Sequence, residues 1–151
     1  MPQPFQSVLV RVEGEQWAPG DERQTIRFAC PGRLYVSDGG RVLLYRELES
    51  AGMGRTLTKL ELRPDGGVRL VRTGDVSMSM TLYSGQREET RIHTPHGILS
   101  LGLFVSRVQL FEQPDGGSAK LSYTLDYGNQ QTLNTRLDIR YQYSDEDGWE
   151  S

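Results

Sequence analysis

Apolar and polar side chains alternate along most of the chain, and a period of two is the pattern of a β-strand with one buried face. The alternation is clearest in residues 121–127 and 133–143, where apolar side chains fall on odd positions and polar ones between them. These two segments predict the strands of an antiparallel hairpin. Shorter alternating or apolar segments predict further strands at 8–12, 26–28, 42–47, 55–63, 67–73, 76–82 and 87–93.

Turns with a shared signature separate several of these segments. Asp-Gly-Gly occurs at 38–40, 65–67 and 115–117, and the last two follow a proline. Asp and Gly tolerate the positive φ angles that tight hairpin turns require, so each segment predicts a hairpin tip. A fourth turn is predicted at 126–129.

The segment 98–112 contains a phase slip. Its apolar residues are odd-numbered up to Val105 and even-numbered from Val108 onward. A β-bulge near Ser106 would return both sets to one face, as occurs where barrel strands bend. A helical turn is conceivable only in residues 46–54, and that segment is short. The sequence therefore predicts an all-β, single antiparallel up-and-down β-barrel of about eight to ten strands.

Length and charge fit one domain over residues 1–151, with a core at about 6–143 and an acidic tail at 144–151. The 17 basic and 20 acidic residues give a net charge of -3, so no nucleic-acid partner is expected. The longest apolar stretch, 98–105, is too short to span a membrane, so none is expected. The first seven residues lack the features of a secretory signal, which makes a cytoplasmic location the expectation.

Arg72 is the charged residue most informative about function, because it shares its alternation phase with Val68, Leu70 and Met78. A buried guanidinium without a partner is very costly. Glu47 and Glu61 are the candidate partners within the chain, and an acidic ligand is the alternative. A head group that reaches the barrel rim would also satisfy the pattern.

Other reactive side chains give weaker signals. His93 and His96 flank a proline in a predicted turn, and no third ligand completes a metal site, so no metal or other cofactor is expected. Cys30 has no base close in sequence, which favours a small buried residue. Motifs for nucleophilic catalysis and for phosphate loops are absent, so an enzyme is the least favoured class.

Several segments resemble the YwiB-like family of small, uncharacterised bacterial proteins. They are 44–47, the run 71–80, Thr94-Pro95-His96-Gly97 and the pair 121–125 with 133–141. The resemblance covers roughly residues 7–143 and implies a calycin-like or lipocalin-like β-barrel in a bacterial cytoplasm. It brings no known activity. It also implies that Glu47, Arg72, Thr94 and Gly97 lie at recurrent family positions, whereas His96 stands where the family often has an aromatic residue.

Two hypotheses of function follow. In the first, the protein is a non-enzymatic binding module whose interior holds one small ligand. Its apolar or aromatic body would contact Met78, Met80 and Tyr123, and its acidic group would lie near Arg72 beside Glu47. In the second, side chains fill the interior, and the barrel acts as a homodimer or with a protein partner. Core packing is the commoner use of methionine, so the volume of the interior decides between them.

Overall fold

The computed structural model describes residues 4–47, 56–75, 77–128 and 131–145, and within them the regular structure consists of ten β-strands. Their bounds are β1 (Phe5–Trp17), β2 (Gln24–Ser37), β3 (Gly40–Glu47), β4 (Thr56–Leu62), β5 (Val68–Gly74), β6 (Ser77–Leu82), β7 (Arg87–Thr94), β8 (Gly97–Gln113), β9 (Gly116–Gly128) and β10 (Gln131–Tyr143). The helical turn conceivable at 46–54 is not formed at Arg46 and Glu47, which end β3, and the rest of it lies outside the described residues.

The ten strands form a closed antiparallel barrel in which each strand pairs with its neighbours in sequence and β10 pairs with β1. This confirms the predicted all-β up-and-down barrel. Closure leaves few unpaired sheet edges, which suits a chain built from consecutive hairpins.

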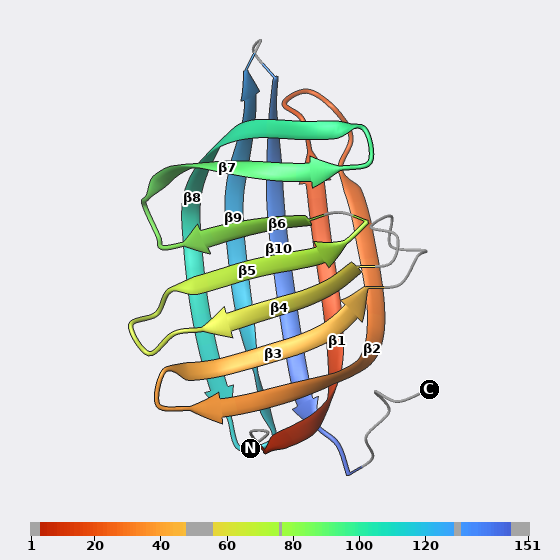
Figure 1. Cartoon of the computed structure of the whole chain (residues 1–151), viewed down its shortest axis with the longest axis vertical. Helices are drawn as coiled ribbons and strands as arrows, with labels where there is room; N and C mark the ends of the chain where they lie inside the picture. The colour runs from red at the N-terminus through yellow and green to blue at the C-terminus, as the bar shows by residue number, and fades with distance from the viewer. Residues whose placement is uncertain (1–3, 48–55, 76, 129–130, 146–151) are drawn as a thin grey trace.

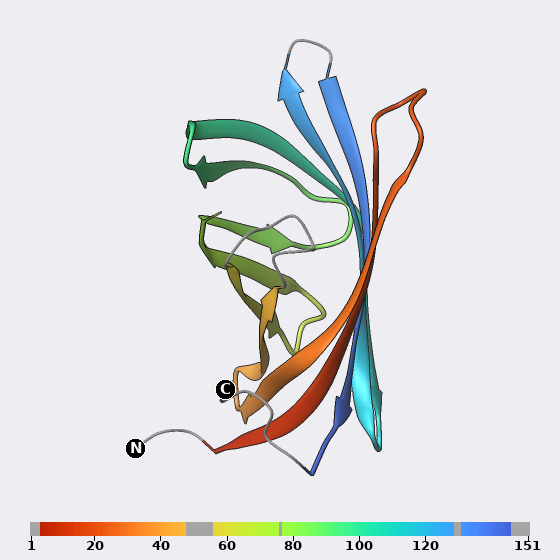
Figure 2. The same ribbon diagram turned by 90° about the vertical axis from the view of Figure 1, so that its right-hand side faces the viewer.

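Strand lengths divide the barrel into two parts. β1, β2, β8, β9 and β10 have 13 to 17 residues, whereas β3 to β7 have 6 to 8. In Figure 1 the short strands run across the long ones, and Figure 2 shows them as a separate wall facing the long sheet. The β2–β3 ladder begins only at Gly32, so none of the described residues of β3 pairs with 24–31 of β2. That half of β2 borders the candidate site.

The predicted bulge lies in β8. Its pairing with β9 shifts register between Val105 and Arg107, which leaves Ser106 as the extra residue. At the same point the β6–β7 turn pairs with β8: Gly85 N donates to Val105 O at 2.7 Å, and Val105 N donates to Gln86 O at 2.9 Å. The bulge thereby turns both the odd residues before it and the even residues after it toward the interior.

The three Asp-Gly-Gly turns connect consecutive strands as predicted, but their glycines serve different needs. Gly40 and Gly66 have φ angles of +114° and +90°, which other residues rarely adopt. Gly117 instead lies where a Cβ would collide with the side chain of Tyr141, so it permits close packing. The fourth turn begins as predicted with Gly128 N donating to Asp126 Oδ1 at 2.9 Å, and residues 129–130 lie outside the described part.

Candidate functional site

An ion pair lies inside the barrel between the last residue of β3 and the middle of β5. Arg72 Nη2 lies 3.3 Å from Glu47 Oε1, and the two side chains are only 11% and 4% exposed. Alternation along both strands explains the placement, since Tyr45 and Glu47 on β3 share an inward phase with Leu70 and Arg72 on β5. The sequence-based partner Glu47 is therefore confirmed.

The prediction of Glu61 as the other partner of Arg72 was wrong. Glu61 lies between buried Leu60 and Leu62 on β4, so alternation turns it to the outer face. There Glu61 Oε2 lies 3.4 Å from Arg69 and 3.9 Å from Lys59.

The surroundings of Arg72 keep its guanidinium charged and fixed. Burial alone would lower the pKa of Arg72, but the Glu47 carboxylate and then the Tyr123 and Tyr45 hydroxyls act in the other direction, and the net effect raises the pKa. Arg72 Nη1 also donates to Met78 Sδ at 3.8 Å. Burial raises the pKa of Tyr123, and the nearby Arg72 partly offsets that rise. Tyr123 therefore stays a neutral hydroxyl beside a permanent cation.

The ion pair does not satisfy all of its own polar atoms. Among the described residues, Glu47 Oε2, Arg72 Nε and Thr58 Oγ1 are buried without a hydrogen-bond partner. An unsatisfied buried polar group costs about 1–3 kcal/mol, and more when it is charged. Such groups are rare in native folds, and a bound water or ion, strain or a functional role accounts for them.

A cavity of about 80 Å³ lies against Glu47, Arg72 and Tyr123. Six strands contribute to its lining, which consists of Val12, Gly14, Glu15, Gln16, Gln24, Ile26, Phe28, Glu47, Arg72, Tyr123, Thr135 and Leu137. Water occupies roughly 30 Å³ per molecule, so this volume holds two or three waters or a small polar group. Drug-sized ligands require about 300–1,000 Å³.

The charged residues Glu47 and Arg72 form the floor of the cavity, and its walls are apolar and then polar toward the opening. Phe28, Leu137 and Val12 give an apolar wall, whereas Gln16, Gln24 and Glu15 on the β1–β2 hairpin give a polar rim. Ile26, at 37% exposed, lies at the border between them. The cavity thus has a charged floor, an apolar neck and a polar opening.

The five predicted site residues separate into three groups. Arg72, Glu47 and Tyr123 line one cavity. Met78 contacts Arg72 and does not line the cavity, and Met80 is 2% exposed within the core. Sequence reasoning missed Phe28 and Thr135. The alternation 133, 135, 137 placed Thr135 in the inward phase, so a polar residue among apolar ones was a readable signal.

His93, His96 and Cys30 do not line this cavity. His93 is exposed on β7 and His96 is exposed in the turn after it, whereas Cys30 is buried on β2. No group of three or more His, Cys, Asp or Glu side chains in the described residues could hold a metal ion. The described part of the chain also contains no helix that is long and apolar enough to cross a membrane.

Comparison with known proteins places the chain in a family. Residues 10–139 match the family described as "Domain of unknown function (DUF1934)". The chain belongs to this family. The crystal structure of the YwiB protein from Bacillus subtilis superposes with a TM-score of 0.79 over 93% of each chain, at 19% sequence identity. At this identity the likeness shows a shared barrel fold, and it agrees with the YwiB-like resemblance of the sequence. No curated protein matches the chain significantly.

Proposed function

We propose that this DUF1934 barrel is a non-enzymatic binding protein that holds the polar head of a small molecule against Glu47 and Arg72. One observation carries the proposal: Glu47 Oε2 and Arg72 Nε are buried and unpartnered, and both residues line the same cavity. A ligand that offers one donor and one acceptor would satisfy both atoms at once.

Charge favours a neutral head group over the acidic one that the sequence suggested. Arg72 already has a carboxylate partner at 3.3 Å, and Glu15 at the cavity opening has a cation of its own, since Glu15 Oε2 lies 2.9 Å from Arg23 Nη1. Arg72 is thus already neutralised, and an added anion would be buried without a countercharge. A carboxamide or a urea presents an N–H to Glu47 Oε2 and a carbonyl oxygen to Arg72 Nε without adding charge.

The cavity volume limits the size and affinity of this head group. About 80 Å³ accepts a group of about three non-hydrogen atoms, such as a carboxamide. The best small ligands gain about 1.5 kcal/mol per non-hydrogen atom, so the head alone supports a Kd no lower than about 0.5 mM. Tighter binding requires a body that contacts Phe28, Leu137 and Ile26 at the neck. The proposal therefore replaces Met78 and Met80 with these residues as the contacts of an apolar body.

Three probes of matched shape and different charge test the proposal: benzamide, benzoate and benzylamine. We expect benzamide to raise the melting temperature and to shift the amide NMR signals of residues 28, 72 and 135, whereas benzoate and benzylamine should leave these three signals nearly unchanged. A Phe28→Trp variant fills the neck and should abolish the benzamide response. Phe104→Trp makes the same change at an exposed residue on β8 and should preserve the response.

Two results would overturn the proposal. One is the absence of any benzamide response up to 10 mM, and the other is an equal response in the Phe28→Trp and Phe104→Trp variants. Either result would favour the rival hypothesis, a barrel with a packed interior that acts as a homodimer or with a protein partner. Light scattering would then test the homodimer directly.

A further inference from the structure

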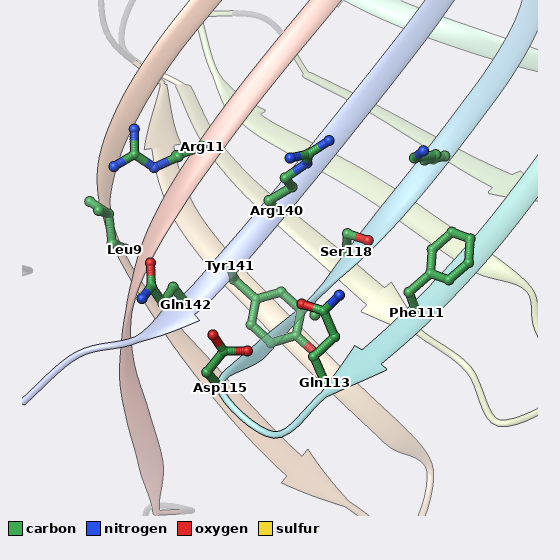
Figure 3. A pocket seen from close by; sticks show the side chains of 11 residues that line it. Leu9, Arg11, Phe111, Gln113, Asp115, Ser118, Arg140, Tyr141 and Gln142 are labelled. Atoms are coloured by element: carbon green, nitrogen blue, oxygen red, sulfur yellow. The ribbon is translucent and has the colours of Figure 1, made fainter.

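A second and larger hollow lies on the outer face of the long sheet, where the side chains of β1, β8, β9 and β10 point away from the barrel interior. Its volume is about 500 Å³, and three cations line it: Arg11, Lys120 and Arg140. Figure 3 shows Arg11, Arg140, Ser118 and Phe111 projecting from neighbouring strands around it. The hollow shares no lining residue with the interior cavity.

Strand register accounts for its shape. Arg11 pairs with Arg140, Arg140 with Ser118, and Ser118 with Phe111, so one row crosses four strands. Neighbouring strands lie about 4.8 Å apart, which gives the row a length of about 14 Å. The short side chain of Ser118 stands between the long side chains of Arg140 and Phe111, and Ala29 follows Arg11 on β2. Small residues within the row therefore leave the surface hollow.

Arg11 and Arg140 lie directly opposite each other across the β1–β10 ladder. Like charges in this position destabilise a sheet. Arg140 is compensated, because its Nε and Nη2 donate to Asp138 Oδ1 and Oδ2 at 3.4 and 3.2 Å, and the Glu13 carboxylate also acts on it. Arg11 makes no ion pair or side-chain hydrogen bond with any described residue.

Each guanidinium group offers a planar set of N–H donors that planar or tetrahedral oxyanions fit. At the other end of the row, Phe111 is 44% exposed and offers its ring to the hollow. Lys120 Nζ lies 5.8 Å from the centre of that ring, so a third cation stands near the aromatic wall. The arrangement combines cations with an apolar contact on strands whose backbones lie roughly 10–14 Å apart.

We propose that this outer hollow binds a small molecule in which an oxyanion, phosphate or carboxylate, is attached to a flat ring. The oxyanion bridges Arg11 and Arg140, and the ring lies over Ser118 against Phe111. Asp115 is the one acidic side chain in the lining, and it lies at the turn before β9. The site is independent of the proposal for the interior cavity.

Four probes test the oxyanion and the ring of this ligand separately: phenyl phosphate, benzoate, inorganic phosphate and benzyl alcohol. We expect phenyl phosphate to shift the amide NMR signals of residues 11, 118 and 140, inorganic phosphate to bind the same residues more weakly, and benzyl alcohol to have no effect. Comparison of phenyl phosphate with benzoate identifies which oxyanion is preferred. Raising NaCl from 50 to 500 mM should weaken binding severalfold, because the site is exposed.

Single variants test the two arginines and the ring. Arg11→Gln and Arg140→Gln should each weaken phenyl phosphate at least fivefold, and Arg91→Gln, which removes an exposed charge on β7, should leave it unchanged. Phe111→Ala should remove the advantage of phenyl phosphate over inorganic phosphate. Without ligand, Arg11→Gln should be at least as stable as the wild type, because it relieves the opposed charges.

The proposal fails if phenyl phosphate and benzoate leave these signals unshifted at 10 mM. It also fails if Arg11→Gln and Arg91→Gln bind equally well, which would reduce the cations to nonspecific surface charge. Loss of stability in the Arg11→Gln variant would assign Arg11 to the fold and would count equally against a site.

Discussion

Replacing Glu47 with glutamine tests how much free energy of unfolding is lost when the buried ion pair is broken. The glutamine would keep the shape of the side chain but would leave the guanidinium of Arg72, 11% exposed, without a countercharge. Breaking a buried pair on one side costs about 3–5 kcal/mol, because the remaining charge stays desolvated. Domains are stable by about 5–15 kcal/mol in total. We therefore expect Glu47→Gln to remove at least about a fifth of the folding free energy of a typical domain.

Urea unfolding followed by tryptophan fluorescence measures this loss. With a slope of about 2 kcal/mol per molar urea, a loss of about 4 kcal/mol moves the midpoint by about 2 M. Glu61→Gln is the matched control, since it breaks a pair with Arg69 and Lys59 whose side chains are 26–42% exposed. Such surface pairs contribute about 0–1 kcal/mol. The Glu47→Gln effect should also survive 1 M NaCl, which screens the surface pair.

A double variant distinguishes a desolvated charge from a simple packing defect. Glu47→Met with Arg72→Met removes both charges and fills the space with apolar side chains, and it should be more stable than Glu47→Gln. Similar midpoints for Glu47→Gln and Glu61→Gln would refute the reasoning, because they would mean that Arg72 reaches water. A double variant that is less stable than Glu47→Gln would likewise show that packing, and not charge, governs this part of the core.

Three further predictions concern other parts of the barrel. A Cβ at Gly32 would collide with the Val10 side chain and a backbone carbonyl, so Gly32→Ala should cost about 3 kcal/mol in thermal melting. A Cβ at Gly39 would make only an ordinary contact with Ser37 Oγ at 3.9 Å, so Gly39→Ala should change stability by less than about 0.5 kcal/mol. Burial, reinforced by a nearby carboxylate, raises the pKa of Cys30 to about 11, so iodoacetamide should alkylate it far more slowly at pH 8 than in urea, and equal rates would contradict its burial. Hydrogen bonds from a backbone N–H and from the Tyr83 hydroxyl lower the pKa of Asp65 below its ordinary 3.8. The advantage of the wild type over Asp65→Asn should therefore be present at pH 7 and fade as the pH falls below about 3.8, and a constant difference in urea midpoint would refute it.

Much of the fold was predictable because a strand with one buried face shows alternating apolar and polar residues in its own sequence. The odd positions of β10 and the inward phase of Arg72 could be read locally, without knowledge of the partners. The same alternation could have excluded Glu61 as a partner of Arg72. Leu60 and Leu62 flank it, so the alternation already assigned Glu61 to the outer face.

The wall of the interior cavity could not be predicted in this way. Phe28, Leu137 and Arg72 come from three strands that are far apart in sequence, and they meet only because the barrel closes with a particular stagger. Stagger depends on the relative lengths of the ladders and on bulges, and neither is visible in the alternation of a single strand. The same limitation hid that Met78 contacts Arg72 and Met80 lies within the core, and that neither of them lines the cavity.

The bulge at Ser106 determines which β8 side chains face the core and which face the outer surface of the barrel. A shift of one residue in register moves every following side chain to the other face of the sheet. Without the extra residue in β8, Phe111 would therefore point inward and Leu110 outward. With the bulge, Val105 and Leu110 both face the core, and Phe111 lies outside beside Ser118. The bulge therefore serves interior packing and the outer hollow together. The phase slip that revealed the bulge in the sequence was also a clue that the end of β8 places an exposed aromatic ring on the sheet surface.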